Sequence, residues 1–91
     1  MEKRWTLYIL ECKDGSLYTG VTDNLVRRLS AHRAGKGAKY TRGRGPLILR
    51  YVELCDDRTQ ALRREVAVKA LRRAEKLALC NENPANESDL K

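Results

Sequence analysis

The sequence predicts a small α+β domain in which helices flank a three-stranded antiparallel sheet, in the order β-β-α-β-α(α). Two short apolar segments meet at an Asp-Gly turn, which is typical of a β-hairpin. Helical periodicity follows the hairpin and returns after a third β-rich segment. The chain has 91 residues, a length that suits one domain with a shallow surface site.

Two adjacent segments predict the hairpin. Trp5 to Cys12 is rich in β-branched and aromatic residues and is apolar on both faces, as expected of a central strand. Leu17 to Thr22 predicts the second strand, with Lys13-Asp14-Gly15 as the turn between them. Leu47 to Leu54 predicts the third strand.

The length of the turn decides which side chains share a face of the hairpin. A two-residue turn would pair Tyr8 with Val21 and send Tyr8 and Tyr18 to opposite faces. A three-residue turn with Gly15 in the left-handed region would pair Tyr8 with Gly20, so that the two tyrosines share one face. An Asp-Gly sequence suits both turns, and the local residues leave the register open.

Capping residues and glycines predict where the helices begin and end. Asp23 or Asn24 caps a first helix that runs to about residue 34. Glycines and bases fill residues 35–46, which predicts a mobile loop. Asp57 or Thr59 opens a long helical stretch, residues 57–80, with a break expected near residue 71.

The domain is expected to cover residues 1–81, and residues 82–91 predict a polar, disordered tail. No apolar run approaches the ~20 residues that a membrane helix needs. The three cysteines are odd in number and far apart, which argues against a disulfide framework or a metal knuckle. They predict buried, inert thiols in a reducing cytoplasm. Nothing in the sequence predicts the oligomeric state or an organic cofactor.

The net charge is +7, and its distribution is more informative than its size. Residues 27–50 carry eight bases and no acid. An unrelieved basic stretch repels itself unless a polyanion binds it, so nucleic acid is the first partner to consider.

The first predicted helix separates two adjacent arginines. At 100° per residue, Arg27 lies opposite the apolar face and should point to water. Arg28 lies at the edge of that face, one turn before His32, and is better placed to be held over a site where it contacts a phosphate with two donors. His32, the only histidine, suits phosphate binding or proton transfer. The apolar face is expected to consist of Leu25, Val26 and Leu29.

Glu65 lies inside a mostly apolar arc of the second predicted helix, where a carboxylate needs a partner. Lys69, four residues later, offers an exposed helical ion pair worth a few tenths of a kcal/mol. The functional alternative is a single oxygen ligand for Mg²⁺, which commonly keeps several waters and needs only one or two carboxylates.

Together these residues resemble the GIY-YIG nuclease domain. Its two tripeptides appear in altered form as Thr6-Leu7-Tyr8 and Tyr18-Thr19-Gly20. They are followed by an arginine-bearing helix at residues 23–29 and by a helix with a lone glutamate, Glu65. The resemblance extends over Trp5 to Leu79 and is strongest to the small stand-alone bacterial members.

The resemblance implies roles for the hairpin residues. Tyr8 and Tyr18 would be the two family tyrosines, one acting as a general base, or orienting one, toward the attacking water. Gly20 would give the close approach that the motif requires. If both tyrosines line one site, the three-residue turn is the correct register.

The resemblance also implies roles for the helix residues. Arg28 would bind the scissile phosphate and stabilise its charge in the transition state. His32 falls where the family often has a tyrosine or histidine. Glu65 would bind a single divalent ion, Mg²⁺ or Mn²⁺. The candidate nucleic-acid-binding residues are Gly20, Arg27, Lys36, Lys39, Arg42 and Arg44.

The sequence departs from the family pattern in two places. Thr6 and Leu7 replace the glycine and isoleucine of the first tripeptide, and neither supplies a reacting atom. The asparagine that the family often carries about a dozen residues after the glutamate is missing, and Asn81 comes too late. The missing asparagine bears on whether the protein is catalytically active.

The expected function is metal-dependent hydrolysis of DNA, selective for shape rather than sequence and connected with DNA repair or recombination. The preference for DNA over RNA rests on the resemblance alone. One alternative is a non-catalytic nucleic-acid-binding module on the same fold. A weaker one is an accessory protein whose basic face docks on a partner.

Overall fold

A computed structural model describes residues 5–85 and places three strands and three helices in the predicted order. The strands are β1 (Trp5–Glu11), β2 (Leu17–Thr22) and β3 (Ile48–Cys55). They form one antiparallel sheet in the order β2-β1-β3, so β1 is central, as its apolar faces predict. The α+β fold class predicted from the sequence is therefore confirmed.

The hairpin has the three-residue turn. The Cys12 amide donates to the Ser16 carbonyl at 2.9 Å, and Gly15 between them has a φ of +83°, which favours glycine. Tyr8 accordingly pairs with Gly20 and Leu10 with Tyr18. This register places Tyr8 and Tyr18 on one face of the sheet, which confirms the consequence drawn from the resemblance.

Side-chain caps set the helix starts. The first helix, α1 (Leu25–Arg33), begins after Asn24, whose side chain accepts the Arg27 amide, and the second, α2 (Arg58–Lys69), begins after Asp57. The predicted break before the third helix, α3 (Arg73–Glu82), is confirmed.

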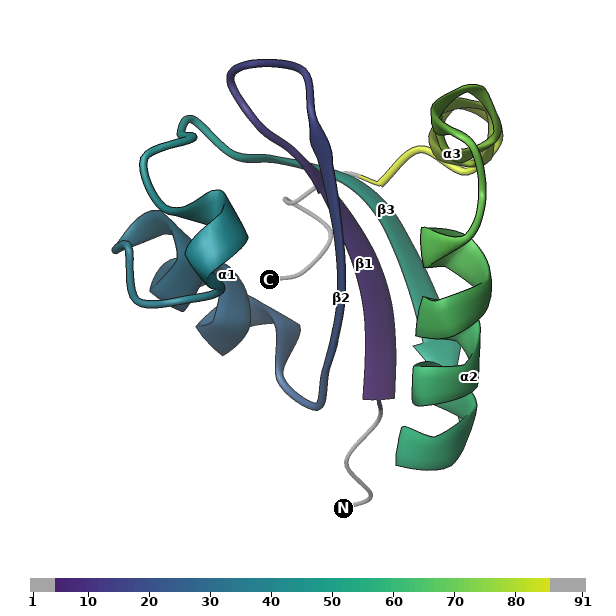
Figure 1. Cartoon of the computed structure of the whole chain (residues 1–91). Coiled ribbons are helices and arrows are strands. Elements are labelled where there is room, and N and C mark those ends of the chain that lie inside the picture. Colours follow the sequence, from purple (N-terminus) through teal and green to yellow (C-terminus); the bar gives the residue numbers. More distant parts are fainter. Residues whose placement is uncertain (1–4, 86–91) are drawn as a thin grey trace.

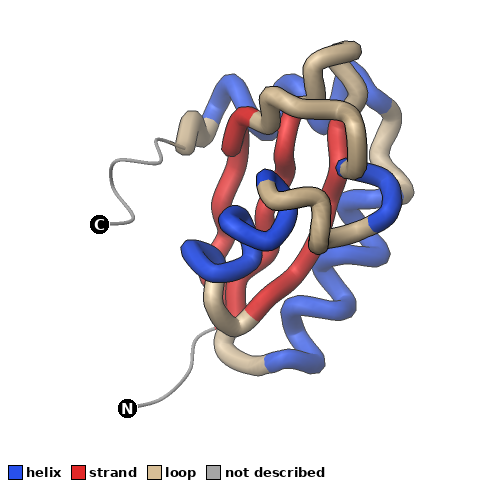
Figure 2. Tube along the Cα trace, turned by 90° about the vertical axis from the view of Figure 1, so that its left-hand side faces the viewer, coloured by secondary structure: helices blue, strands red, loops and turns tan. Residues whose placement is uncertain are grey.

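The helices cover opposite faces of the sheet. Figure 1 shows α1 on one side, with α2 and α3 on the other. Figure 2 looks onto the α1 face, where the segment between α1 and β3 also crosses the strands. The α2 side holds a core cluster of Leu7, Ile9, Tyr51, Cys55, Ala61, Val68 and Cys80. The α1 side holds a second cluster of Tyr8, Leu10, Cys12, Leu25, Leu29, Leu47 and Leu49.

The buried face of α1 differs from the predicted one. Leu25, Leu29 and His32 are buried, whereas Val26 is 55% exposed. Positions 25, 29 and 32 lie on one side of a helix at spacings of four and three residues, and position 26 falls about 100° away from 25. The buried position completing the face is therefore a histidine, which the hydrophobic pattern alone does not reveal.

The segment predicted as a mobile loop is held by specific contacts. It contains a single 3₁₀ turn, Lys39–Thr41, in which Thr41 is buried. Its Arg44 carbonyl accepts the Lys13 amide of the hairpin turn at 2.8 Å. This segment therefore closes over one end of the α1 face.

The expected tail begins inside the described part of the chain. Helix α3 includes Glu82, and the Ala85 amide donates to the Arg50 carbonyl at 3.4 Å. The rest of the tail lies outside the described residues. The three cysteines are free and buried, as predicted, and burial raises the pKa of Cys55 and Cys80. Across residues 5–85, no helix is long and apolar enough to span a bilayer.

Candidate functional site

Tyr8 lies at the centre of the candidate site. It is fully buried in the middle of β1, and its hydroxyl lies 2.8 Å from His32 Nε2 on α1. Gly20 on β2 makes room for the ring, because a Cβ at that position would lie 2.7 Å from Tyr8 Oη. Gly20 thus allows a close approach to the Tyr8 ring.

Tyr18 completes an aromatic cluster with Tyr8 and His32. Its ring centroid lies 6.3 Å from that of Tyr8 and 5.2 Å from that of His32, and it meets the histidine edge to face. The antiparallel register brings the two tyrosines together, and the helix supplies the histidine.

Arg27 and Arg28 on α1 differ as their helical positions predict. Arg27 is exposed, whereas Arg28 is half-buried against the tyrosines. A hydrogen bond with Tyr8 is the main cause that raises the pKa of Arg28. Both arginines line a surface depression of about 400 Å³, so the guanidinium next to Tyr8 is accessible from the surface.

Burial and nearby charges set the protonation states of Tyr8 and His32. Burial raises the pKa of Tyr8 to about 12, although the hydrogen bond from Arg28 acts in the opposite direction. Burial and the positive charge of Arg28 lower the pKa of His32 below its ordinary value of 6.5. At pH 7 the tyrosine therefore keeps its proton while the histidine is neutral and available as a base.

Glu65 forms the predicted ion pair and also lies near the tyrosines. Its carboxylate lies 3.3 Å from Lys69 Nζ, as the helical spacing predicts, but its side chain is only 20% exposed. Burial is the main cause that raises the pKa of Tyr8, and the charges of Tyr18 and Glu65 add to it. The carboxylate therefore belongs to the surroundings of the tyrosine pair as well as to an ion pair.

The Glu65 carboxylate suits a hard divalent cation better than zinc. Among residues 5–85, no three His, Cys, Asp or Glu side chains gather as a metal cluster, which argues against zinc. One half-buried carboxylate fits a hard cation such as Mg²⁺, which keeps several waters and takes its other ligands from a phosphate.

The basic residues around the site fall into two groups. Arg44 is tied down, because it pairs with Asp14 at 2.6 Å and its guanidinium lies 4.5 Å from the centre of the Tyr40 ring. This finding gives Arg44 an anchoring role in addition to the expected phosphate contact. The exposed candidates are Arg27, Lys36, Lys39 and Arg42.

Three residues of the segment between α1 and β3 belong to the site although the sequence did not single them out. Thr41 Oγ1 lies 2.8 Å from His32 Nδ1. Gly37 packs against the same ring, and Tyr40 contacts the Tyr18 ring at a centroid distance of 5.8 Å. An aromatic residue among bases was the only signal for Tyr40; nothing periodic marks Thr41 or Gly37.

Asn81 does not replace the missing family asparagine. Its side-chain carbonyl lies 3.2 Å from Arg50 Nη2, and the same guanidinium forms an ion pair with Glu11. These contacts engage Asn81 outside the tyrosine cluster.

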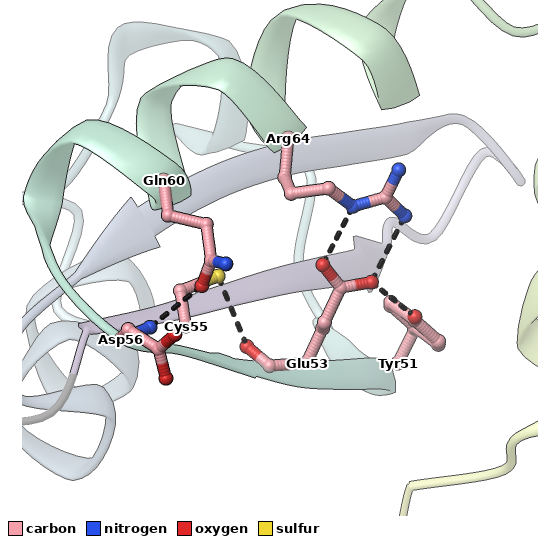
Figure 3. A network of polar contacts seen from close by, with 6 residues as sticks. All are labelled: Tyr51, Glu53, Cys55, Asp56, Gln60 and Arg64. Carbon is pink, nitrogen blue, oxygen red and sulfur yellow. Dashed lines mark hydrogen bonds and ion pairs between the residues drawn. The ribbon is translucent and has the colours of Figure 1, made fainter.

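A second polar cluster lies on the α2 face of the sheet. Figure 3 shows the Glu53 carboxylate between Tyr51 and Arg64. The Tyr51 hydroxyl donates to it at 2.7 Å, and Arg64 donates twice, at 2.6 and 2.9 Å. The sequence did not predict this cluster.

Comparisons with known proteins agree with the fold and the motif. The sequence model of the GIY-YIG catalytic domain matches residues 4–78. A UPF0213 protein of Halobacterium salinarum is 52% identical over 73 residues, 80% of this chain and 95% of that protein. One of Oceanobacillus iheyensis is 51% identical over 79 residues, 87% of this chain and 92% of that protein. The NMR structure of a UPF0213 protein from Bacillus halodurans has 43% identity and a TM-score of 0.60, covering 97% of this chain and 94% of that one.

Proposed function

This chain belongs to the GIY-YIG catalytic-domain family, a family of nucleases, and from that membership we propose that it is an endonuclease that hydrolyses DNA phosphodiester bonds with a divalent cation. The observation that carries the proposal is the position of the Tyr8 hydroxyl. It lies 2.8 Å from Nε2 of His32, a neutral base, and next to Arg28, a cation that lines a surface depression. A phosphate oxygen bound by Arg28 therefore lies beside a hydroxyl that is ready to exchange a proton.

The chemistry follows from these protonation states. An attacking water gives a proton to Tyr8 Oη while the tyrosine passes its own proton to His32 Nε2, so no free tyrosinate is needed at neutral pH. Arg28 stabilises the charge that develops on the phosphate oxygens. Tyr18 packs on the rings of Tyr8 and His32 and holds them in place.

Glu65 is the residue that would hold the divalent cation, Mg²⁺ or Mn²⁺, together with waters and the phosphate. When bound, such an ion supplies positive charge to the phosphate and the leaving oxygen. Lys69 would give up its contact with Glu65 in that state.

The surroundings of the site favour binding by backbone and shape. The exposed bases Arg27, Lys36, Lys39 and Arg42 contribute affinity for phosphates without reading bases. We therefore expect a preference for branched, nicked or single-stranded DNA, as in repair or recombination. The three free cysteines fit action in a reducing cytoplasm.

The test compares cleavage of flap, nicked, branched and linear DNA in the presence of Mg²⁺, Mn²⁺ or EDTA. The wild-type protein should cleave at least one substrate with either cation and none with EDTA. Glu65→Gln should abolish the cation-dependent cleavage, whereas Glu75→Gln, an exposed glutamate on α3, should retain it. Cleavage that persists in Glu65→Gln at the wild-type cation requirement would contradict the assignment of Glu65.

A non-catalytic binding module is the second candidate, and the contact between Lys69 and Glu65 favours it because it occupies the carboxylate. RNA and DNA would then bind with strong salt dependence but without cleavage of any substrate. Salt-sensitive binding without product on all four DNA forms would establish this alternative.

A further inference from the structure

A chain of hydrogen bonds continues from His32 into the segment between α1 and β3. His32 Nδ1 lies 2.8 Å from Thr41 Oγ1, which in turn lies 2.9 Å from the Ala38 carbonyl oxygen. His32 and Thr41 are each 2% exposed, so water does not compete for these bonds. The arrangement places a side chain of unassigned role on the far side of the candidate base.

The direction of each bond follows from counting protons. A threonine hydroxyl has one hydrogen, and the Ala38 carbonyl can only accept, so the Thr41 hydroxyl donates to it. Thr41 Oγ1 must then accept from His32, which requires a proton on Nδ1. Because a neutral imidazole carries only one proton, Nε2 is left as an acceptor facing Tyr8.

The other end of the chain is compatible with the same assignment. A guanidinium has donors only, so Arg28, which lies close to Tyr8, does not compete for the tyrosine proton. The single Tyr8 proton is then free to point at His32 Nε2. The bonds of Thr41 therefore select the Nδ1–H form of the histidine, and the Tyr8 end is compatible with it.

We propose that Thr41 is a positioning residue that holds His32 in the Nδ1–H tautomer, so that Nε2 always faces Tyr8 as an acceptor. The assignment of the tautomer rests on the hydrogen bonds alone, and its effect on cleavage rests on the proposed function. In the opposite tautomer, the histidine would donate to Tyr8 and could not receive its proton.

Packing around the ring supports this role. A Cβ at Gly37 would lie 2.5 Å from His32 Nδ1 and 2.8 Å from Cγ, so the backbone of this segment touches the ring edge on the Thr41 side. Tyr40, next to Thr41, packs on Tyr18 and lies under Arg44, which is paired with the hairpin turn. The turn that carries Thr41 is thus fixed from both sides.

The experiment reads the tautomer directly by ¹⁵N NMR of the imidazole. His32 is the only histidine of the chain, so the spectrum contains a single imidazole pair. In wild-type protein near neutral pH, we expect Nδ1 to be the protonated nitrogen. A spectrum in which Nε2 carries the proton would overturn the proposal, whatever the activity of the protein.

Three variants test whether Thr41 is the cause. Thr41→Val has nearly the same shape but no acceptor, so it should shift the equilibrium toward the Nε2–H form, and Thr41→Ser should restore the wild-type spectrum. Thr19→Val is the matched control, because Thr19 Oγ1 is also buried but has no hydrogen-bond partner among the described residues. A wild-type tautomer in Thr41→Val, with the backbone spectrum showing a folded protein, would refute the proposal.

Cleavage adds a second readout. Thr41→Val should lower kcat at least ~10-fold with little change in DNA affinity, and Thr41→Ser should recover most of the loss. A shifted tautomer with full kcat would refute the role in catalysis. If wild-type protein cleaves no substrate, the proposed function fails, and the NMR result alone decides the role of Thr41 in fixing the tautomer.

Discussion

The two polar clusters on opposite faces of the sheet use similar residues to different ends. On the α1 face, the Tyr8 hydroxyl meets His32 and Arg28. On the α2 face, the Tyr51 hydroxyl meets Glu53, which Arg64 holds with two bonds (Figure 3). Each cluster contains a tyrosine, an arginine and an acceptor.

The clusters differ in whether their charges are balanced. Arg64 neutralises Glu53 and lowers the pKa of that carboxyl. Within residues 5–85, no carboxylate forms an ion pair with Arg28, and burial together with the Arg28 charge lowers the pKa of His32. A balanced cluster stabilises the fold and has nothing left to bind, whereas an unbalanced one is suited to an anionic ligand.

Replacing the arginine of each cluster should give the largest difference in kcat. Arg28→Gln removes the charge proposed to face the phosphate and should lower kcat by ~1,000-fold. Arg64→Gln should leave kcat within about twofold of wild type, because its partner lies on the other face. Single-turnover cleavage at saturating DNA measures both. Equal losses in the two variants would remove the distinction between the clusters.

Removing the tyrosine hydroxyl of each cluster should give a smaller difference in kcat. Tyr8→Phe deletes the proton path to His32 and should lower kcat by ~100-fold. Tyr51→Phe should not affect cleavage but should lower the free energy of unfolding by about 1 kcal/mol through the lost hydrogen bond. Cleavage and urea unfolding of both variants provide the comparison, which is reversed if Tyr51→Phe is the slower enzyme.

The ion pairs of Glu53 and Glu65 should also differ in how much each stabilises the fold. Glu53→Gln weakens a two-bond contact with Arg64 and should cost about 1 kcal/mol, since both side chains are partly exposed and water screens the pair. Glu65→Gln loses a single contact with the exposed Lys69 and should cost ~0.3 kcal/mol. Urea midpoints at pH 7 measure both costs. A larger loss at Glu65 would mean that its carboxylate supports the fold more than the structure indicates.

The smallest effect is in the pH dependence of stability. The folded-state pKa values of His32 and Glu53 both lie below their ordinary values of 6.5 and 4.5, so the unfolded chain takes up protons first in each case. Stability should therefore begin to fall below pH 6.5 because of His32, and again below pH 4.5 because of Glu53. Unfolding of His32→Gln should lack the first decline and retain the second. An unchanged first decline in His32→Gln would assign it to another group.

Local patterns determined most of the framework. Strand-forming residues predicted the three strands, and capping residues placed the start of α1 at Asp23 or Asn24 and that of α2 at Asp57 or Thr59. The structure selects Asn24 and Asp57. The difference between Arg27 and Arg28 followed from helical geometry, because one turn of helix fixes which neighbours share a side. The lone glutamate and its lysine partner were visible for the same reason.

The sequence by itself therefore determined the order of elements, the basic stretch and the different sides of α1 on which Arg27 and Arg28 lie. Only the tertiary structure decided the hairpin register, the contacts of Thr41 and Gly37 with His32, and the pairing of Glu53 with Arg64. The physical reason is that these contacts join segments that are far apart in the chain, and such contacts leave no periodic pattern in the sequence. A loop partner is selected by how the chain closes over the sheet, and only packing between layers fixes that path.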